Sequence, residues 1–266
     1  MTPSDLPPAV VVKLGGAIVS DLEAVATLWA SVRALCEGGT HVVIVHGGGP
    51  QSTELARRLG HEPRIVAGRR VTSDLDLDVA LYVLRGAVNA RLAAAAQGAG
   101  LAAVGIAAGD GFTVRVQRRP PLEVDGETVD FGHVGDVVSA DGTLVRTLLD
   151  AGFVPVVAPI CADASGRVFN VNADTVASEI AAALGAQRLD LVTETGGVRC
   201  DAADPASLLS RLTEAEVEAG VAAGWIAGGM RPKLEVARAA LRRGVPAVRV
   251  CALADVAGEG GTTVVP

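Results

Sequence analysis

The sequence predicts an α/β protein, an open αβα sandwich built around a mainly parallel β-sheet. Short runs of β-branched residues lack the polar alternation of half-exposed strands, which is typical of strands covered on both faces. Each run is followed by a turn signal and a helical pattern, and alternating β and α units stack in layers. The runs are Val10–Val12, Val42–Val45, Val154–Val157, Leu189–Val192 and Ala247–Val250.

The first predicted helix follows the first strand. Ser20 and Glu23 have the spacing of a capping box, and Gly38–Gly39 is a stop signal. Between them, apolar residues recur at helical spacing, which predicts one buried stripe. The stripe consists of Leu22, Val25, Trp29, Val32 and Leu35.

Two later helices have comparable signals. Thr213 and Glu216 repeat the spacing of a capping box. A further helix is predicted from Pro232 to Arg243, ending at Gly244. These signals specify the scaffold rather than the chemistry.

The pattern changes between about Val104 and Val138, where short apolar runs are interrupted by polar residues. Asp125–Gly126 is a hairpin-turn signal, so we expect a β-hairpin insertion or a lid over a cleft. No low-complexity linker interrupts the chain. We therefore expect two compact lobes, residues 1–184 and 185–266, with the boundary near Leu184–Gly185.

Composition restricts the class of function. The 266 residues are 50% apolar but only 3% aromatic, so Val, Leu, Ile and Ala must form the core. A net charge of −7 argues against a nucleic-acid partner, because such binding depends on clustered Lys and Arg. The apolar run in MTPSDLPPAVVVKLGG is too short for a signal peptide or a membrane span. We expect a cytoplasmic protein with no membrane partner.

The cysteines and histidines do not have metal-ligand spacing. The cysteines are scattered and lack a CxxC pair, which favours reduced thiols over a zinc site or disulfides. The histidines form no HExxH motif and no nucleophile pair, so we predict no protein-bound metal. For His46, beside a glycine loop, we favour a structural role. The cysteines are Cys36, Cys161, Cys200 and Cys251.

The segment VVIVHGGGP, Val42 to Pro50, is the first candidate binding site. Consecutive glycines let backbone N–H groups approach an anion, and the following helix N-terminus adds a favourable dipole. The alternative is a tight strand–helix turn without a ligand. The segment is neither a Walker A loop nor GxGxxG, so a dinucleotide site is weakly supported.

Lys13, in VVVKLGG, is the second candidate. It lies at the carboxyl end of a predicted buried strand, where open α/β sheets bind ligands. The alternative is a strand-end lysine that extends to water. The neighbouring Gly15–Gly16 favours a second surface that a phosphate can approach. Lys233, in GGMRPKL, supplies a second positive charge from the other end of the chain.

Two further segments contain candidate ligand-binding side chains. Asn170, Asn172 and Asp174 stand within five residues, ahead of an Ala-rich helix. Asn172 or Asp174 could cap this helix, but three polar side chains exceed what one cap needs, so we expect at least one to face a ligand. Arg70, in GRRVTSDLD, has a planar fork that suits a carboxylate, and the alternative is a surface arginine.

Six motifs occur in order: VVVKLGG, VVIVHGGGP, GRRVT, FNVNAD, GGV after a strand, and GGMRPKL. From about Val10 to Val265 the chain resembles the amino-acid kinase family, and within it the members that act on N-acetylglutamate. The resemblance implies the amino-acid kinase fold and ATP-dependent phosphorylation of the γ-carboxylate of N-acetyl-L-glutamate in arginine biosynthesis. It also implies Mg²⁺ carried by ATP, an N-terminal lobe (1–184) for the amino-acid substrate and dimerisation, and a C-terminal lobe (185–266) for ATP.

The resemblance also assigns roles to residues. The implied catalytic residues are two lysines that stabilise the transferring phosphoryl group and a carboxylate that orients both, Lys13, Lys233 and Asp174. The implied substrate-binding residues are Gly48, Gly49, Arg70 and Asn170. The implied nucleotide-binding residues are Gly16, Thr193 and Lys233.

Three features depart from the family pattern. The usual Ser/Thr-Asp pair appears as Thr193–Glu194, and Arg69 fills a position that is usually apolar. Only nine residues precede the first predicted strand, whereas arginine-inhibited members have an extra N-terminal helix. We therefore expect an arginine-insensitive homodimer.

Two alternatives remain at this point. Another kinase of the same family would act on carrier-bound aminoadipate, on glutamate or on carbamate, although HGGGP and GRRVT favour N-acetylglutamate. A non-catalytic nucleotide-binding regulatory module would keep the glycine loops, but it would not need Lys13, Asp174 and Lys233 together.

Overall fold

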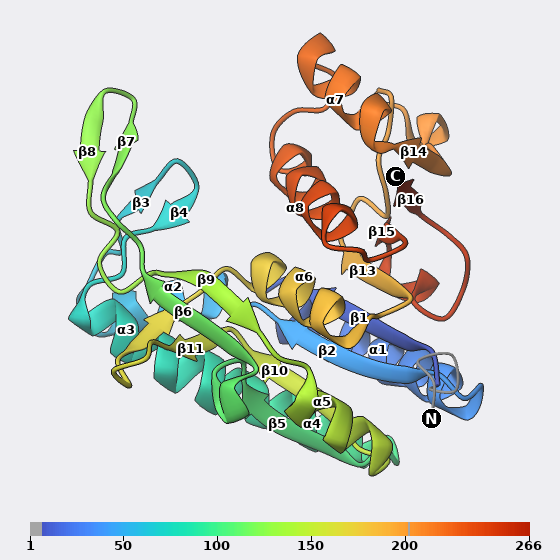
Figure 1. Cartoon of the computed structure of the whole chain (residues 1–266), viewed down its shortest axis with the longest axis horizontal. Coiled ribbons are helices and arrows are strands. Elements are labelled where there is room, and N and C mark those ends of the chain that lie inside the picture. The colour runs from blue at the N-terminus through green and yellow to red at the C-terminus, as the bar shows by residue number, and fades with distance from the viewer. Residues whose placement is uncertain (1–6, 202) are drawn as a thin grey trace.

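The computed structural model describes residues 7–201 and 203–266, and an eight-stranded β-sheet is its middle layer (Figure 1). Neighbouring strands are parallel except for the pair β15 and β16. The five predicted strands are confirmed and are consecutive neighbours, from β15 to β10. The order is β14 (Arg211–Thr213), β16 (Thr262–Val265), β15 (Val248–Cys251), β13 (Arg188–Val192), β1 (Ala9–Leu14), β2 (His41–His46), β10 (Val154–Ala158) and β5 (Ala103–Ala107).

Helices cover both faces of this sheet, which confirms the predicted αβα sandwich. Val10 and Val12 of β1 pack in one core with Leu28 of the first helix. Val11 enters the core on the opposite face with Ile180. The helices are α1 (Leu22–Glu37), α2 (Gly49–Arg58), α3 (Asp74–Ala80), α4 (Asn89–Gly98), α5 (Thr143–Asp150), α6 (Ala173–Leu184), α7 (Glu214–Ala223) and α8 (Met230–Arg242).

Helix α3 continues through a π-helical segment, Leu81–Val88, into α4. This run, residues 74–98, has the length and apolar composition of a membrane span, but half of its most apolar window is buried inside the fold. Such burial is typical of a core helix.

A smaller four-stranded sheet and two hairpins complete the fold. Asp125 and Gly126 have φ values of 52° and 83°, as a two-residue hairpin turn requires, so the predicted turn is confirmed. Figure 1 shows both hairpins on one side and the C-terminal helices α7 and α8 on the other. The strands are β12 (Val168–Asn170), β11 (Ile160–Ala162), β6 (Val114–Arg118) and β9 (Gly135–Ala140), with hairpins β3 (Ile65–Val66)–β4 (Arg69–Arg70) and β7 (Leu122–Val124)–β8 (Glu127–Val129).

The predicted N-cap of α1 is wrong by one residue. Asp21 is the cap, because its carboxylate accepts hydrogen bonds from the N–H groups of Glu23 and Ala24, at 2.9 and 3.1 Å. Ser20 ends the preceding 3₁₀ turn instead. The predicted stripe is also wrong at Leu22, which is 86% exposed, and it begins at the buried Val25.

The later helix signals agree with the structure more closely. The capping box of Thr213 and Glu216 is present at the start of α7. Helix α8 begins at Met230, two residues before the predicted start, and ends at Arg242, next to the predicted end.

Two glycine turns pack against each other where β1 and β2 end. The Gly47 N–H donates to the Leu14 carbonyl at 2.9 Å, which joins the two turns. A Cβ at Gly16 would lie 2.6 Å from Cδ of Pro50 in the first turn of α2. Because the approach is this close, Lys13 of β1 lies near the N-terminus of α2.

A buried ion-pair network joins β13 and β15. Asp190 is fully buried and accepts bonds from Arg249 Nε at 3.0 Å and Nη2 at 2.9 Å, while Arg188 Nε lies 2.8 Å from the same carboxylate. Arg249 also donates to the Val256 carbonyl at 3.1 Å. The Asp190–Arg249 pair thereby joins β13 to β15, and the Arg249 guanidinium extends the network to the C-terminal loop.

We predict that Asp190→Asn lowers the free energy of unfolding by about 3 kcal/mol or more, because the change leaves buried guanidinium charge uncompensated. Urea unfolding measures this loss. Glu235→Gln is the control, since it removes an exposed ion pair with Arg231 and should cost under about 1 kcal/mol. Equal losses in the two variants would contradict the prediction.

We also predict that Gly16→Ala destabilises the protein by about 1–3 kcal/mol, because its methyl group would overlap the rigid Pro50 ring. Gly15→Ala is the matched control, since no atom lies within 4 Å of the position that a Cβ would take there. The control should change stability by no more than about 1 kcal/mol. Thermal unfolding of both variants provides the comparison, and a tolerated Gly16→Ala would show that the two turns can separate.

Candidate active site

Two adjoining pockets lie where β1, β2 and β13 end. The larger pocket has a volume of about 490 Å³ and the smaller pocket about 280 Å³. Lys13 and Gly16 line both pockets. Open α/β sheets bind ligands in this crevice beyond the strand ends. One ammonium group can therefore contact ligands on both sides.

The smaller pocket lies between the glycine loop, α3 and the NVNAD segment. All the predicted substrate-binding residues line this pocket, together with the predicted catalytic Asp174. The structure thus brings together segments from three parts of the chain. The predicted substrate-binding residues are Gly48, Gly49, Arg70 and Asn170.

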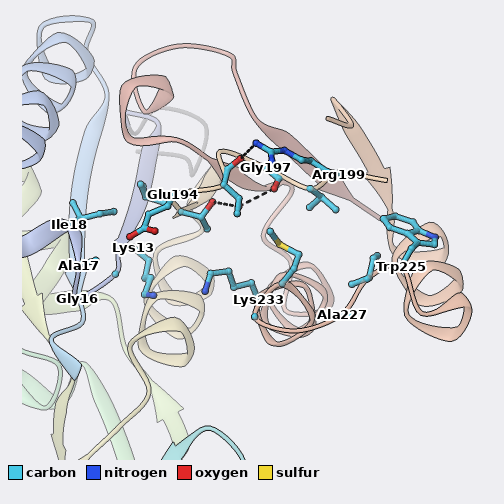
Figure 2. A pocket seen from close by; sticks show the side chains of 18 residues that line it. Lys13, Gly16, Ala17, Ile18, Glu194, Gly197, Arg199, Trp225, Ala227 and Lys233 are labelled. Atoms are coloured by element: carbon cyan, nitrogen blue, oxygen red, sulfur yellow. Dashed lines mark hydrogen bonds between the residues drawn. The ribbon is translucent and has the colours of Figure 1, made fainter. Parts of the chain in front are cut away.

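The larger pocket lies between the turn after β1, the segment after β13 and the start of α8. The predicted Gly16, Thr193 and Lys233 line it. Figure 2 shows the ammonium ends of Lys13 and Lys233 at one end and the Trp225 indole at the opposite end. The pocket therefore suits a ligand with an anionic end and a flat apolar end. Its wall is largely apolar, with Ile18, Val192, Val198, Ile226 and Met230.

Lys13 forms an ion pair with Asp174 in the first turn of α6. Its Nζ lies 2.7 Å from Oδ1, and the two side chains are only 10% and 15% exposed. Asn172 caps the helix, because its Oδ1 accepts from the N–H groups of Asp174 and Thr175 at 2.7 and 3.3 Å. Asp174 is thus not the cap, and its carboxylate is available to hold Lys13.

Lys233 is placed differently. It lies on α8, in the larger pocket, and among the described residues it forms no ion pair, so Asp174 contacts one of the two lysines here. Both lysines belong to the same pocket, but only Lys13 reaches the smaller one.

Arg70 is not a surface arginine, since its side chain is 13% exposed. Its Nη2 donates to Thr53 Oγ1 at 2.6 Å and to the Gly49 carbonyl at 3.4 Å. Its Nη1 donates to Asp76 Oδ1 at 3.2 Å. The guanidinium is therefore fixed between α2 and α3 at the edge of the smaller pocket.

His46 supports the glycine loop from behind and has no acid–base role in this arrangement. Its Nδ1 donates to the Gly47 carbonyl at 2.9 Å, and Asn89 Nδ2 donates to its Nε2 at 3.1 Å. Burial lowers the pKa of His46 to about 4, so the ring is neutral at neutral pH. Asn89 also donates to the Val156 carbonyl at 2.8 Å, which ties the loop to β10.

In the part of the chain that the structure describes, no group of three His, Cys, Asp or Glu side chains could hold a metal ion. Glu194 is exposed and lines the larger pocket. Arg69 is exposed in β4, and nothing in the structure explains why an arginine stands there.

Three residues that line the pockets or hold a pocket residue were not predicted from the sequence. Asp76 and Thr53 hold Arg70, and Trp225 lines the larger pocket. The sequence contained a signal for two of them. Ser73 and Asp76 have capping-box spacing, and Trp225 is an aromatic residue close before GGMRPKL in a chain poor in aromatics.

The chain is similar in sequence to known kinases. The chain is 46% identical to an acetylglutamate kinase of Anaeromyxobacter dehalogenans, over 90% of this chain and 89% of that protein. It is 43% identical to an acetylglutamate kinase of Symbiobacterium thermophilum, over 91% of this chain and 83% of that protein.

A solved structure has the same fold. The carbamate kinase of Giardia lamblia bound to AMP-PNP superposes with a TM-score of 0.72 at 16% identity, covering 97% of this chain and 98% of that chain. The model of the amino acid kinase family matches residues 8–252. With this match over nearly its whole length, the chain belongs to the amino acid kinase family.

Proposed function

We propose that the protein transfers the γ-phosphoryl group of ATP to the γ-carboxylate of N-acetyl-L-glutamate, a reaction that serves arginine biosynthesis. The observation that carries the proposal is the pair of adjoining pockets joined at Lys13. A kinase needs this layout, because donor and acceptor must meet at one point. The similarity to acetylglutamate kinases supports this choice of acceptor.

The chemistry explains why basic residues rather than a general base meet at this point. A γ-carboxylate is ionised at neutral pH, so its oxygen attacks the γ-phosphorus directly. The bond between that phosphorus and the β–γ bridging oxygen breaks, and ADP leaves. The obstacle is repulsion between two anions. At ~4 Å and an effective dielectric near 20, one compensating unit charge contributes about 4 kcal/mol before desolvation.

In this scheme, Lys13 contacts both reacting groups and Asp174 holds it in place. Lys233 neutralises the phosphate side from the larger pocket. N–H groups of the glycine loop donate to the transferring group, as preorganised donors do in phosphoryl transfer. Arg70 and Asn170 hold the α-carboxylate end of the acceptor in the smaller pocket.

ATP fits the larger pocket by its chemistry and size. Its phosphates meet Lys13 and Lys233, and the base extends toward Trp225 at the apolar end. Pockets of about 300–1,000 Å³ are usual for ligands of this size. We infer that Mg²⁺ enters with ATP, since this ion is usually held largely by phosphate oxygens and water.

We also infer two lobes, residues 1–184 for the acceptor and 185–266 for ATP. The boundary falls at Gly185, which ends α6 in a left-handed conformation (φ 61°). A homodimer fits the exposed Leu75 and Tyr82 on the long helical run and the edge strand β5, which contacts α4 of that run. Sedimentation velocity would test this assembly.

A hydroxylamine-trapping assay tests the function, because hydroxylamine converts an acyl phosphate into a hydroxamate, which forms a coloured complex with added Fe³⁺. With ATP and Mg²⁺, N-acetylglutamate should be turned over, whereas glutamate, aspartate and carbamate should not. Turnover of one of these instead would favour another kinase of the family. Nucleotide binding without any acyl phosphate would favour a regulatory module.

Lys13→Ala and Lys233→Ala should each lower kcat by about 10²-fold or more, the loss expected for one preorganised transition-state donor. Steady-state kinetics under saturating substrates measures this. Lys13→Arg and Lys233→Arg are the matched variants, since they keep the charge on a larger group. A near-normal kcat for either alanine variant would remove that lysine from the catalytic set.

Trp225 offers a direct measure of nucleotide binding. The chain has two tryptophans, and Trp29 is buried in the core at 1% exposure while Trp225 is 37% exposed at the larger pocket. In Trp29→Phe, ADP should change the indole fluorescence, whereas inorganic tripolyphosphate should bind and leave it nearly unchanged. An equal response to both ligands would show that the base does not reach Trp225.

A further inference from the structure

One carboxylate faces the smaller pocket from α3 without a place in the proposed chemistry. Asp76 is 2% exposed and lines this pocket, although the acceptor proposed for it is an anion. A buried carboxylate in an anion-binding pocket is unfavourable unless its charge is compensated. Its surroundings therefore indicate its role.

Asp76 is held by four donated hydrogen bonds. Arg70 Nη1 donates to Oδ1 at 3.2 Å. Oδ2 accepts from Ser73 Oγ at 2.6 Å, from the Ser73 N–H at 3.2 Å and from His61 Nε2 at 3.0 Å. Burial raises the pKa of Asp76, but these bonds outweigh it and hold the pKa below its usual value. The carboxylate is ionised and tied to a helix start.

Arg70 needs such an anchor because its own element is weak. Strand β4 has two residues and pairs only with the two residues of β3, and an isolated two-stranded hairpin is at best marginally stable in water. The side chain, by contrast, contacts Thr53 and Gly49 of α2 and Asp76 of α3. Two helices thus fix a guanidinium that its hairpin would leave movable.

The contacts also leave part of the guanidinium fork available. A guanidinium has five N–H donors, and three hydrogen bonds to the protein are present for Arg70 among the described residues. Its Nε–H has no acceptor among them. Because a guanidinium is planar, a free N–H group donates to a carboxylate in one direction only if that plane is held in a fixed orientation.

We propose that Asp76 is a positioning residue that orients the Arg70 fork toward the α-carboxylate of the acceptor, with Thr53 as its counterpart on α2. The inference rests on the proposed function, since it concerns the acceptor of that reaction. By holding Arg70, Asp76 would make the pocket select a carboxylate at this end of the acceptor over an uncharged group of the same shape.

The test compares two acceptors in the wild type and in Asp76→Asn. One is N-acetyl-L-glutamate, and the other carries a carboxamide in place of its α-carboxylate. The wild type should prefer the first by about tenfold or more in kcat/KM, the effect of one charge-assisted hydrogen bond. In Asp76→Asn, KM for N-acetylglutamate should rise about tenfold, and the preference should fall to about threefold or less. The KM for ATP and kcat should change little.

Asp78→Asn is the matched control, because it removes the same charge from an exposed position of the same helix. It should keep the wild-type preference. Thr53→Val removes the contact to Nη2 without altering the start of α3, and it should reduce the preference in the same direction. If Asp76→Asn does not fold, the preference of Thr53→Val between the two acceptors tests whether the contacts that hold Arg70 set this selectivity.

The measurements distinguish failure of the positioning role of Asp76 from failure of the proposed function. If Asp76→Asn and Thr53→Val affect both acceptors by the same factor, or affect only thermal stability, the positioning role is refuted and the proposed function stands. If the wild type does not phosphorylate N-acetylglutamate, the proposed function is refuted, and the inference falls with it.

Discussion

The ion pair between Lys13 and Asp174 is the interaction on which the site depends. It joins the end of the central strand β1 to the first turn of α6, and both side chains are largely buried. A buried ammonium is stable only beside a compensating charge, and Asn172 leaves Asp174 free for this purpose by capping the helix itself. The ammonium is therefore fixed at the point where the two pockets meet.

The packing of the glycine turns makes this position possible. Lys13 can reach both pockets because the turn after β1 lies directly against the turn after β2 and the start of α2. Any side chain at Gly16 would separate them. On the far side of the loop, Leu84 of the π-helical segment approaches Gly48 so closely that a Cβ there would lie 2.5 Å from its Cδ2. The glycine loop is thus packed closely between the turn after β1 and Leu84, and this packing holds its N–H groups in place.

Lysines and arginines occupy different places in this protein. The chain has two lysines, Lys13 and Lys233, and both line the larger pocket, whereas arginines form the buried scaffold contacts such as Arg249 with Asp190. A guanidinium forms several fixed hydrogen bonds at once, which suits a scaffold. A lysine is a compact charge on a flexible stem, which suits contact with a group that moves between two ligands. In a protein of net charge −7, both lysines line one pocket.

The sequence by itself determined the layers of the fold and the principal segments that line the two pockets. Uninterrupted apolar runs identify strands covered on both faces, and the glycine-rich HGGGP and VKLGG segments mark turns at strand ends, where open α/β sheets bind ligands. The capping-box spacing predicted Ser20 as the cap of α1, whereas Asp21 is the cap, because the choice between adjacent residues depends on backbone angles. Only the tertiary structure decided that Lys13 joins two pockets, that Asp76 holds Arg70 and that Trp225 lines the larger pocket. These facts depend on long-range packing between segments distant in sequence, and no local pattern specifies which side chains meet across such distances.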